Sequence, residues 1–356
     1  MLKKVLTVIG AMAVLSASQA QDSTKGTTTL TYSVDAYYKY DKAGLTSNNK
    51  TSFTNSANSF ELWMASIRVD HSFGKVAATA DLGFGRRAEE FSYNDGSGWN
   101  TKNAYAVGGG NSFNTLAAIK QAYISYQATS KVKFTIGKWA THVGWELLDA
   151  YSNRNYSMSY GFTNGPFFHT GLKADISLGG KSALMIGVAN PTDNSTTSDI
   201  HQVAIAQFST GTKDDKIKAY LNFQGAKDLF QTDLVLNFVL SSKWGLNYDG
   251  TYQNAVVPGV GKMSTWSSNA LYLNFDPSSK IGWTLREELF SDKDGIKFSG
   301  AESVMATTIS ANIHFANLTL IPELRMDGAK KEVFLDKDNK GTKSATSFIL
   351  AATYKF

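Results

Sequence analysis

The chain has 356 residues, a formal net charge of +5, five Pro and no Cys, and Phe, Trp and Tyr make up 12% of it. A net charge this small over this length argues against a nucleic-acid partner, and the lack of Cys excludes disulfides. After Leu15 no run of about twenty apolar residues occurs, so the sequence predicts no membrane-spanning helix.

The first predicted element is a secretory signal peptide. Lys3 and Lys4 precede the apolar run 5–15. In Ser18-Gln19-Ala20, small residues occupy positions −3 and −1 of a signal-peptidase cleavage site. We expect residues 1–20 to be removed, which lowers the formal charge from +5 to +3 because two Lys and no acidic residue are lost. A short buried helix is the alternative interpretation of the same run.

Beyond the leader, segments of about ten residues alternate between apolar and polar side chains, which is typical of β-strands. Sixteen strands are predicted, near 28–40, 60–71, 75–86, 114–127, 132–139, 167–178, 183–190, 200–208, 215–225, 232–241, 244–254, 264–275, 280–290, 302–314, 317–327 and 346–356. The predicted connections alternate between short and long. This rhythm is typical of an outer-membrane barrel, and a soluble β-sandwich has no reason to keep it.

The parity of the charges supports a membrane barrel. In the strand near 28–40, Asp35 and Lys39 share one parity, whereas Val34 and the aromatic residues at 32, 38 and 40 share the other. The last strand alternates in the same way and ends on the aromatic Phe356. We therefore predict an all-β fold, in which residues 21–356 form a transmembrane antiparallel β-barrel of about 16 strands.

Three features do not follow the pattern. Glu287 has the parity that should face lipid, so we expect it at the upper rim of the barrel or in a contact with a neighbouring subunit. The segment 60–71 has apolar residues on both parities, and the segment 200–208 has no clear phase.

The connection 140–166, between the fifth and sixth strands, is long and rich in aromatic and charged residues. Such a loop is rarely a passive surface connection. We expect it to fold into the wide lumen of the barrel and to narrow it, so that charged side chains select solutes there by charge and size.

The stretch GKWATHVGWELLDAYSNRNYSMSYGFTNGPFFHTG, residues 137–171, resembles the signature of the OmpL-like β-barrel porin-2 family. The similar elements are Gly137-Lys138, Gly144-Trp145-Glu146, the run 155–159 and the close from Pro166 to Gly171. The earlier stretches FELWMASIRVD and ADLGFG are also similar to family members. The resemblance implies an outer-membrane porin-like barrel and names no substrate.

The parity of the strands and the position of the loop give a set of candidate pore residues. Those in the loop are His142, Glu146, Asp149 and Arg154, of which Glu146 and Arg154 are the favoured constriction residues. Those on the strands and adjoining loops are Asp35, Arg68, Arg87, Lys173, Asp175, Arg286, Glu288, Glu323, Arg325 and Asp327. The alternative for each is that it pairs with another charge in the lumen and only solvates the interior.

The predicted function is a porin of the bacterial outer membrane. It passes small hydrophilic solutes and ions by passive diffusion through a loop-constricted pore, and no catalytic residue, metal or cofactor is predicted. The expected partners are outer-membrane lipid and the solutes, and a homotrimer is compatible with a barrel of this size. Two alternatives stay open, a barrel enzyme of the lipase or protease type and a plugged barrel that binds a partner through its external loops.

Overall fold

The computed structural model describes residues 26–96, 115–197, 201–256, 261–295, 297 and 303–356. The predicted signal peptide, the middle of the long connection 87–113, and parts of the connections 191–199, 255–263 and 291–301 lie outside the described residues. So do the first residues of the strands predicted at 114, 200 and 302. Among the described residues, no helix is both long and apolar enough to cross a membrane.

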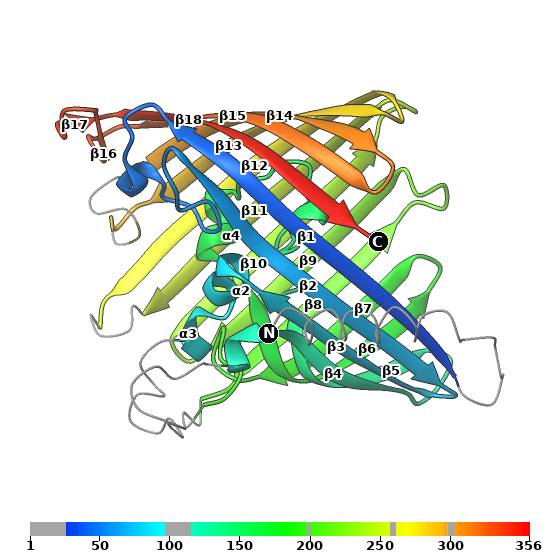
Figure 1. The fold of residues 1–356 in the computed structure, drawn as a ribbon. Helices are drawn as coiled ribbons and strands as arrows, with labels where there is room; N and C mark the ends of the chain where they lie inside the picture. Colours follow the sequence, from blue (N-terminus) through cyan, green and yellow to red (C-terminus); the bar gives the residue numbers. More distant parts are fainter. Residues whose placement is uncertain (1–25, 97–114, 198–200, 257–260, 296, 298–302) are drawn as a thin grey trace, which may run out of the picture.

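Sixteen antiparallel strands close into one barrel (Figure 1). Their bounds are β1 Thr27–Asp41, β2 Ser59–Phe73, β3 Val76–Phe84, β4 Ile119–Gln127, β5 Val132–Ala140, β6 Phe168–Gly179, β7 Ser182–Ala189, β8 Val203–Gly211, β9 Ile217–Ala226, β10 Leu229–Val239, β11 Trp244–Val256, β12 Met263–Ser278, β13 Ile281–Asp292, β14 Ser303–Phe315, β15 Leu318–Ala329 and β18 Ser344–Lys355. Each predicted strand is present, and strand number and order agree with the sequence prediction.

The barrel closes between its first and last strands. Strands β1 and β18 pair from Ser33 opposite Lys355 to Asp41 opposite Ser347. Beyond the end of β18, the backbone of Phe356 exchanges two hydrogen bonds with Tyr32, of 2.8 and 3.0 Å, and the two rings stack at 5.1 Å. Closure leaves no open sheet edge, which a structure inside a bilayer requires because lipid cannot pair with free backbone groups.

The connections differ at the two ends of the barrel. One end has short turns and is called the turn end, and the other has the longer connections and is called the loop end (Figure 1). The loop-end connections contain short helices and one extra hairpin that the sequence did not predict: η1 Thr46–Asn48, α2 Arg86–Phe91, α3 Tyr93–Gly96, η3 Thr115–Ala118, η4 Ala150–Ser152, α4 Tyr160–Asn164, β16 Phe334–Leu335 and β17 Gly341–Thr342.

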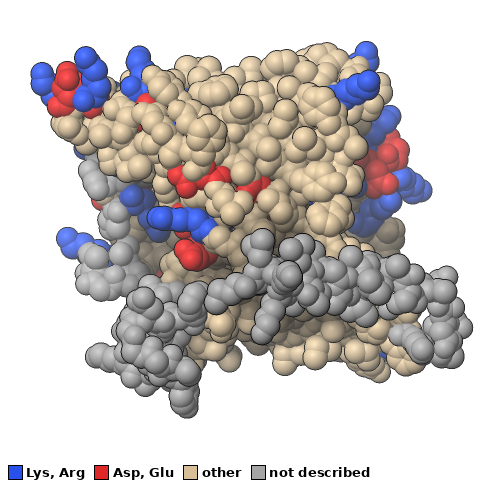
Figure 2. Space-filling model, in the orientation of Figure 1, with Lys and Arg blue, Asp and Glu red and all other residues tan. Residues whose placement is uncertain are grey.

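The outer face of the barrel is apolar and the inner face is polar. On β18, Phe348 and Leu350 are 40% and 48% exposed, whereas Ile349 and Ala351 between them are buried. Figure 2 shows one outer face, where uncharged residues form a broad area and charged atoms gather mainly toward the two ends. A lipid-facing apolar band around a polar interior is the arrangement of transmembrane β-barrels.

A β-bulge explains the mixed parity of the segment 60–71. Asp35 on β1 lies opposite Met64, whereas its neighbour Ala36 lies opposite Leu62, so Trp63 is the extra residue of β2. Trp63 and Met64 are both buried, and Phe60 and Leu62 before them are 85% and 72% exposed. Because a bulge inserts one residue, the outward parity of β2 changes there.

The structure also gives the contacts of the other two irregular features. On β8, Val203 and Ile205 are buried in an inner apolar cluster with Trp139 and Met185, so both parities of this strand are apolar. Glu287 keeps the outward parity of β13, and its Oε2 accepts a hydrogen bond of 2.8 Å from the hydroxyl of Thr307 on β14.

Candidate functional site

The segment between β5 and β6, residues 141–167 and here called the β5–β6 segment, makes many buried polar contacts with the barrel wall. It includes η4 and α4, and α4 begins after Ser159, whose hydroxyl accepts a hydrogen bond of 3.0 Å from the backbone N–H of Phe162. This N-cap satisfies a backbone donor of the first turn. Gly165 and Pro166 follow α4 and lead into β6.

Carboxylates on the inner face of the barrel hold the backbone of this segment. Glu323 on β15 accepts from the N–H groups of Tyr156 and Ser157 at 2.7 and 3.0 Å. Glu288 on β13 accepts from the N–H groups of Tyr160 and Gly161, both at 2.8 Å. Hydrogen bonds to a charged acceptor are about twice as strong as those between neutral groups, so each carboxylate is a strong anchor.

The two ends of the segment are held in the same way. The N–H of Gly144 donates to Asp233 on β10 at 3.0 Å, and the N–H of Trp145 donates to Asp249 on β11 at 2.9 Å. Near the other end, Asp193 accepts from the backbone N–H groups of residues 167 and 168 at 2.6 and 3.0 Å. Burial raises the pKa of Asp193 to about 6, although these two hydrogen bonds favour its charged form.

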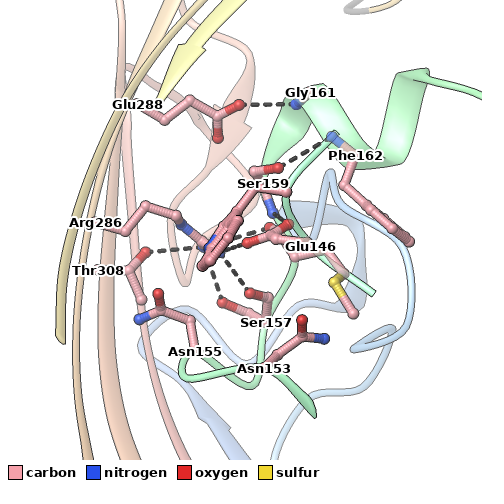
Figure 3. Close-up of polar contacts among 12 residues, drawn as sticks. Glu146, Asn153, Asn155, Ser157, Ser159, Gly161, Phe162, Arg286, Glu288 and Thr308 are labelled. Atoms are coloured by element: carbon pink, nitrogen blue, oxygen red, sulfur yellow. Dashed lines mark hydrogen bonds and ion pairs between the residues drawn. The ribbon is translucent and has the colours of Figure 1, made fainter. Parts of the chain in front are cut away.

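Arginines supply the complementary anchors. The guanidinium of Arg286 on β13 donates to the carboxylate of Glu146 at 2.5 Å and to the carbonyl of Ser157 at 2.7 Å (Figure 3). Arg325 on β15 donates to the carbonyl of Met158 at 2.6 Å and pairs with Asp327 at 2.9 Å. The structure therefore brings six of the predicted residues together around 155–161, namely Glu146, Arg286, Glu288, Glu323, Arg325 and Asp327.

Arg154 lies apart from this group and is the most accessible of the anchoring arginines. Its side chain is 33% exposed, pairs with Asp276 at 2.6 Å and donates to the hydroxyl of Thr284 at 2.7 Å. It lines a cavity of about 410 Å³ together with Trp145 and Lys218. A second cavity, of about 670 Å³, is lined by loop-end residues that include Tyr93 and Thr192.

His142 lies near the start of the segment and contacts the inner wall of the barrel at β9. Its Nε2 donates to the carbonyl of Phe223 on β9 at 3.1 Å, and its ring centroid lies 5.0 Å from that of His169. Burial lowers the pKa of His142 to about 4, so the side chain is neutral at pH 7.

The remaining predicted residues of the loops and of β1 lie beside the segment. Asp149 pairs with Lys120 on β4 at 2.5 Å. Asp35 on β1 accepts a hydrogen bond of 2.6 Å from the hydroxyl of Tyr156. Arg87 of α2 donates to the carbonyl of Leu148 at 2.6 Å, and its guanidinium lies 5.0 Å from the centroid of the Phe53 ring.

Three predicted residues are not part of this contact set. Arg68 on β2 pairs with Asp70 at 2.7 Å. Lys173 and Asp175 pair with each other on β6 at 3.6 Å, and Asp175 also pairs with Lys133 at 3.2 Å.

Several charged residues that hold the segment are absent from the set of candidates predicted from the sequence, among them Lys120, Asp193, Asp233, Asp249 and Asp276. Asp233 and Asp249 have the inward parity of their strands, so the alternation that selected Asp35 would also have selected them. For Asp193 the sequence gives no such signal, because this residue lies in an irregular connection where the period of two does not apply.

A closed barrel with an apolar outer band, a polar inner face and loops at one end defines the protein as a porin-type barrel of the bacterial outer membrane. The model of the family described as "Putative beta-barrel porin-2, OmpL-like" matches residues 27–356, and the chain belongs to this family. The predicted sixteen-stranded antiparallel barrel, the porin class and the outer-membrane localisation are thus confirmed. No curated protein sequence matches the chain.

Solved porin structures share the fold. An anion-selective porin from Comamonas acidovorans has a TM-score of 0.58 and 12% identity, with 93% of this chain and 100% of that chain covered. OmpT, an outer membrane protein of Vibrio cholerae, has a TM-score of 0.58 and 11% identity, with 95% and 99% covered. A mutant of the Rh. blastica porin has a TM-score of 0.54 and 12% identity, with 93% and 100% covered.

Proposed function

We propose that this porin passes small hydrophilic solutes and ions down their gradients through a lumen that the β5–β6 segment narrows. The observation that carries the proposal is the spread of anchors for one segment: Asp233 and Asp249 at its start, and Glu288 and Glu323 at its middle. These carboxylates belong to the inner faces of β10, β11, β13 and β15. Because the segment starts at β5 and ends at β6, partners on these faces support a course across the lumen.

In this proposal most of the buried charges position the segment instead of meeting solutes. Glu146 and Arg286 have side chains that are 4% and 0% exposed, so the two charges neutralise each other and a solute cannot reach them. Arg154, which is partly exposed beside the 410 Å³ cavity, is then the charged side chain of the segment best placed to act on ions. Charged side chains that line a narrow pore select ions by sign.

The proposal also covers the chain as a whole. Residues 1–20 act as a removable signal peptide, and residues 21–356 form the barrel. The protein acts without catalysis, and it assembles as a homotrimer in which Glu287 on the outer face of β13 lies at a subunit contact. The last point rests on the cost of a charged side chain that faces lipid, a cost that burial against a second subunit would remove.

Single-channel recording tests the pore. The purified full-length barrel in a planar bilayer should give discrete, stable current steps, and the reversal potential in asymmetric salt gives its ion preference. A folded barrel that gives no current would overturn the porin mechanism and favour a plugged barrel that binds a partner.

The lack of native Cys allows a direct test of the constriction. A Trp145→Cys variant should lose conductance when a charged thiol reagent is added, because residue 145 lines the cavity beside Arg154. The control is Ser130→Cys, in the exposed turn between β4 and β5, where the same reagent should leave the current unchanged. Equal effects at both positions would contradict a constriction at the β5–β6 segment.

A further inference from the structure

A third cavity, of about 300 Å³, lies at the loop end beside the paired strands β1 and β18. Its lining includes Lys42, Ser344 and Thr346. These three residues continue the parity of Tyr40 on β1 and Phe348 on β18, whose side chains face outward and are exposed. The cavity therefore reaches the outer face of the barrel.

The cavity lies where the apolar band of the outer face ends. Tyr40 lies opposite Phe348, and two residues further toward the loop end the backbone N–H of Lys42 donates to the carbonyl of Thr346 at 3.0 Å. Strands rise about 3.3 Å per residue, so Lys42 lies about 7 Å beyond the aromatic pair. In outer-membrane barrels aromatic side chains mark the boundary of the hydrocarbon layer, and the longer connections are external. Lys42 is thus at the level of the lipid head groups of the outer leaflet.

The apolar surface next to this cavity is unusually exposed. Phe60 and Leu62 on β2 are 85% and 72% exposed, more than any other large apolar side chain among the described residues. Phe60 lies opposite Tyr38 on β1, and their ring centroids are 4.7 Å apart. Together with Tyr40 and Phe348 these side chains form an apolar surface across β2, β1 and β18. An acyl chain can lie on this surface while its head group occupies the cavity.

The charged side chains of the cavity favour an anion. Lys42 and Lys337 line it and are exposed, and within the described part of the chain neither forms an ion pair. Asp336 is the acidic residue of the lining, and its Oδ1 accepts from the N–H groups of Asp338 and Lys340, both at 2.9 Å. This carboxylate therefore fixes a turn, whereas the two ammonium groups are unpaired. In Figure 2, charged atoms gather at the corner where Figure 1 draws β16 and β17, next to a broad uncharged area.

The β16–β17 hairpin, which forms one side of the cavity, is anchored to the barrel. The side chain of Asn48 in η1 donates to the carbonyl of Leu335 at 2.9 Å and accepts from its N–H at 2.8 Å. The preceding Phe334 is buried in an apolar cluster with Tyr160. Because these contacts fix the hairpin before a ligand arrives, binding requires little ordering of the chain.

On this basis we propose that the 300 Å³ cavity binds the phosphorylated head group of an outer-leaflet lipid, whose acyl chains lie on the outer face of β1, β2 and β18. The ammonium groups of Lys42 and Lys337 pair with the phosphate, and the hydroxyls of Ser344 and Thr346 donate to its oxygens. A neutral head group would leave the two lysines unpaired. The proposal does not depend on whether the pore conducts.

Native mass spectrometry of the purified full-length barrel in detergent tests the proposal by titration with three probes. These are dipalmitoyl phosphatidic acid, dipalmitoylglycerol, which lacks the phosphate, and glycerol phosphate, which lacks the acyl chains. Phosphatidic acid should bind about tenfold tighter than either of the others, because it alone makes both kinds of contact. Equally tight binding of dipalmitoylglycerol would show apolar adhesion only, and equally tight binding of glycerol phosphate would show a site for free phosphate. Either result would overturn the proposal.

A double variant, Lys42→Gln with Lys337→Gln, locates the site. It should bind phosphatidic acid about twentyfold more weakly, because each Lys near an anionic lipid surface contributes a factor of about five. The matched control is Lys131→Gln with Lys280→Gln, which removes two exposed lysines from turns at the other end of the barrel and should leave binding unchanged. Equal losses from the two double variants would show attraction of the lipid to any lysine and would contradict a site at this cavity.

Discussion

The guanidinium of Arg286 on β13 lies 2.5 Å from the carboxylate of Glu146 in the β5–β6 segment, and their side chains are 0% and 4% exposed. Arg286 also donates to the carbonyl of Ser157 at 2.7 Å and to the hydroxyl of Thr308 at 3.1 Å. One strand residue thus fixes two parts of the segment that are eleven positions apart in the sequence, 146 and 157.

Breaking this buried pair should destabilise the protein strongly. Glu146→Gln leaves a buried guanidinium without its counter-charge, a change that typically costs about 3–5 kcal/mol. The free energy of unfolding from denaturant titration measures the loss, and a double-mutant cycle with Arg286→Met isolates the coupling. Asp215→Asn, in the exposed pair with Lys181, is the control and should cause little or no change. Similar losses for both variants would contradict a structural role for Glu146.

Removing the charge of Glu323 should loosen the segment without opening the barrel. Glu323→Gln weakens the hydrogen bonds from the N–H groups of Tyr156 and Ser157, with an expected loss of about 1–3 kcal/mol. Amide hydrogen exchange should rise at residues 156 and 157 and stay constant on β15. Glu89→Gln, at an exposed position of α2, should leave all of these rates unchanged.

Acid should weaken the contact between the segment and β9. The pKa of His142 is lowered to about 4 by burial, so its neutral form is the one that the folded state favours. This contribution is fully present above the unfolded pKa of about 6.5 and is lost as the pH falls from there through 4.

Channel current measured between pH 7.5 and 3.5 should therefore become noisier toward the acid end, because a charged imidazole is costly at this buried position and its protonation loosens the segment beside Phe223. A His142→Gln variant should flatten this dependence, because an amide donates to the carbonyl without titrating. The control is His71→Gln, at an exposed position of β2, which should keep the wild-type pH profile. An unchanged profile in His142→Gln would refute the assignment.

Charge reversal at Arg154 should change ion selectivity. Arg154→Glu replaces a partly exposed cation beside the 410 Å³ cavity and opposes Asp276, so cation permeability should rise relative to anion permeability by several-fold. Reversal potentials in a salt gradient measure the change. Arg86→Glu, at a 62% exposed side chain of α2, should have a much smaller effect.

The strands could be predicted from the sequence because alternation is a local property. A period of two is written in consecutive residues, and it correctly placed Asp35 and Lys39 on the inner face and Phe348 and Leu350 on the outer face. The alternation failed to assign a phase where the local signal itself was mixed. On β2 the bulge at Trp63 reverses the parity, and on β8 Val203 and Ile205 make the inner face apolar.

The partners of the β5–β6 segment were decided only by the tertiary structure. The sequence could place Glu146 and Arg286 in the interior, but not 2.5 Å apart, because residues 140 positions apart in the sequence carry no local signal of their distance in space. Backbone N–H groups such as those of Tyr156 and Gly161 carry no side-chain signature at all, yet they are the groups that Glu323 and Glu288 bind. Barrel closure brings these groups together, and their buried polar atoms then require partners.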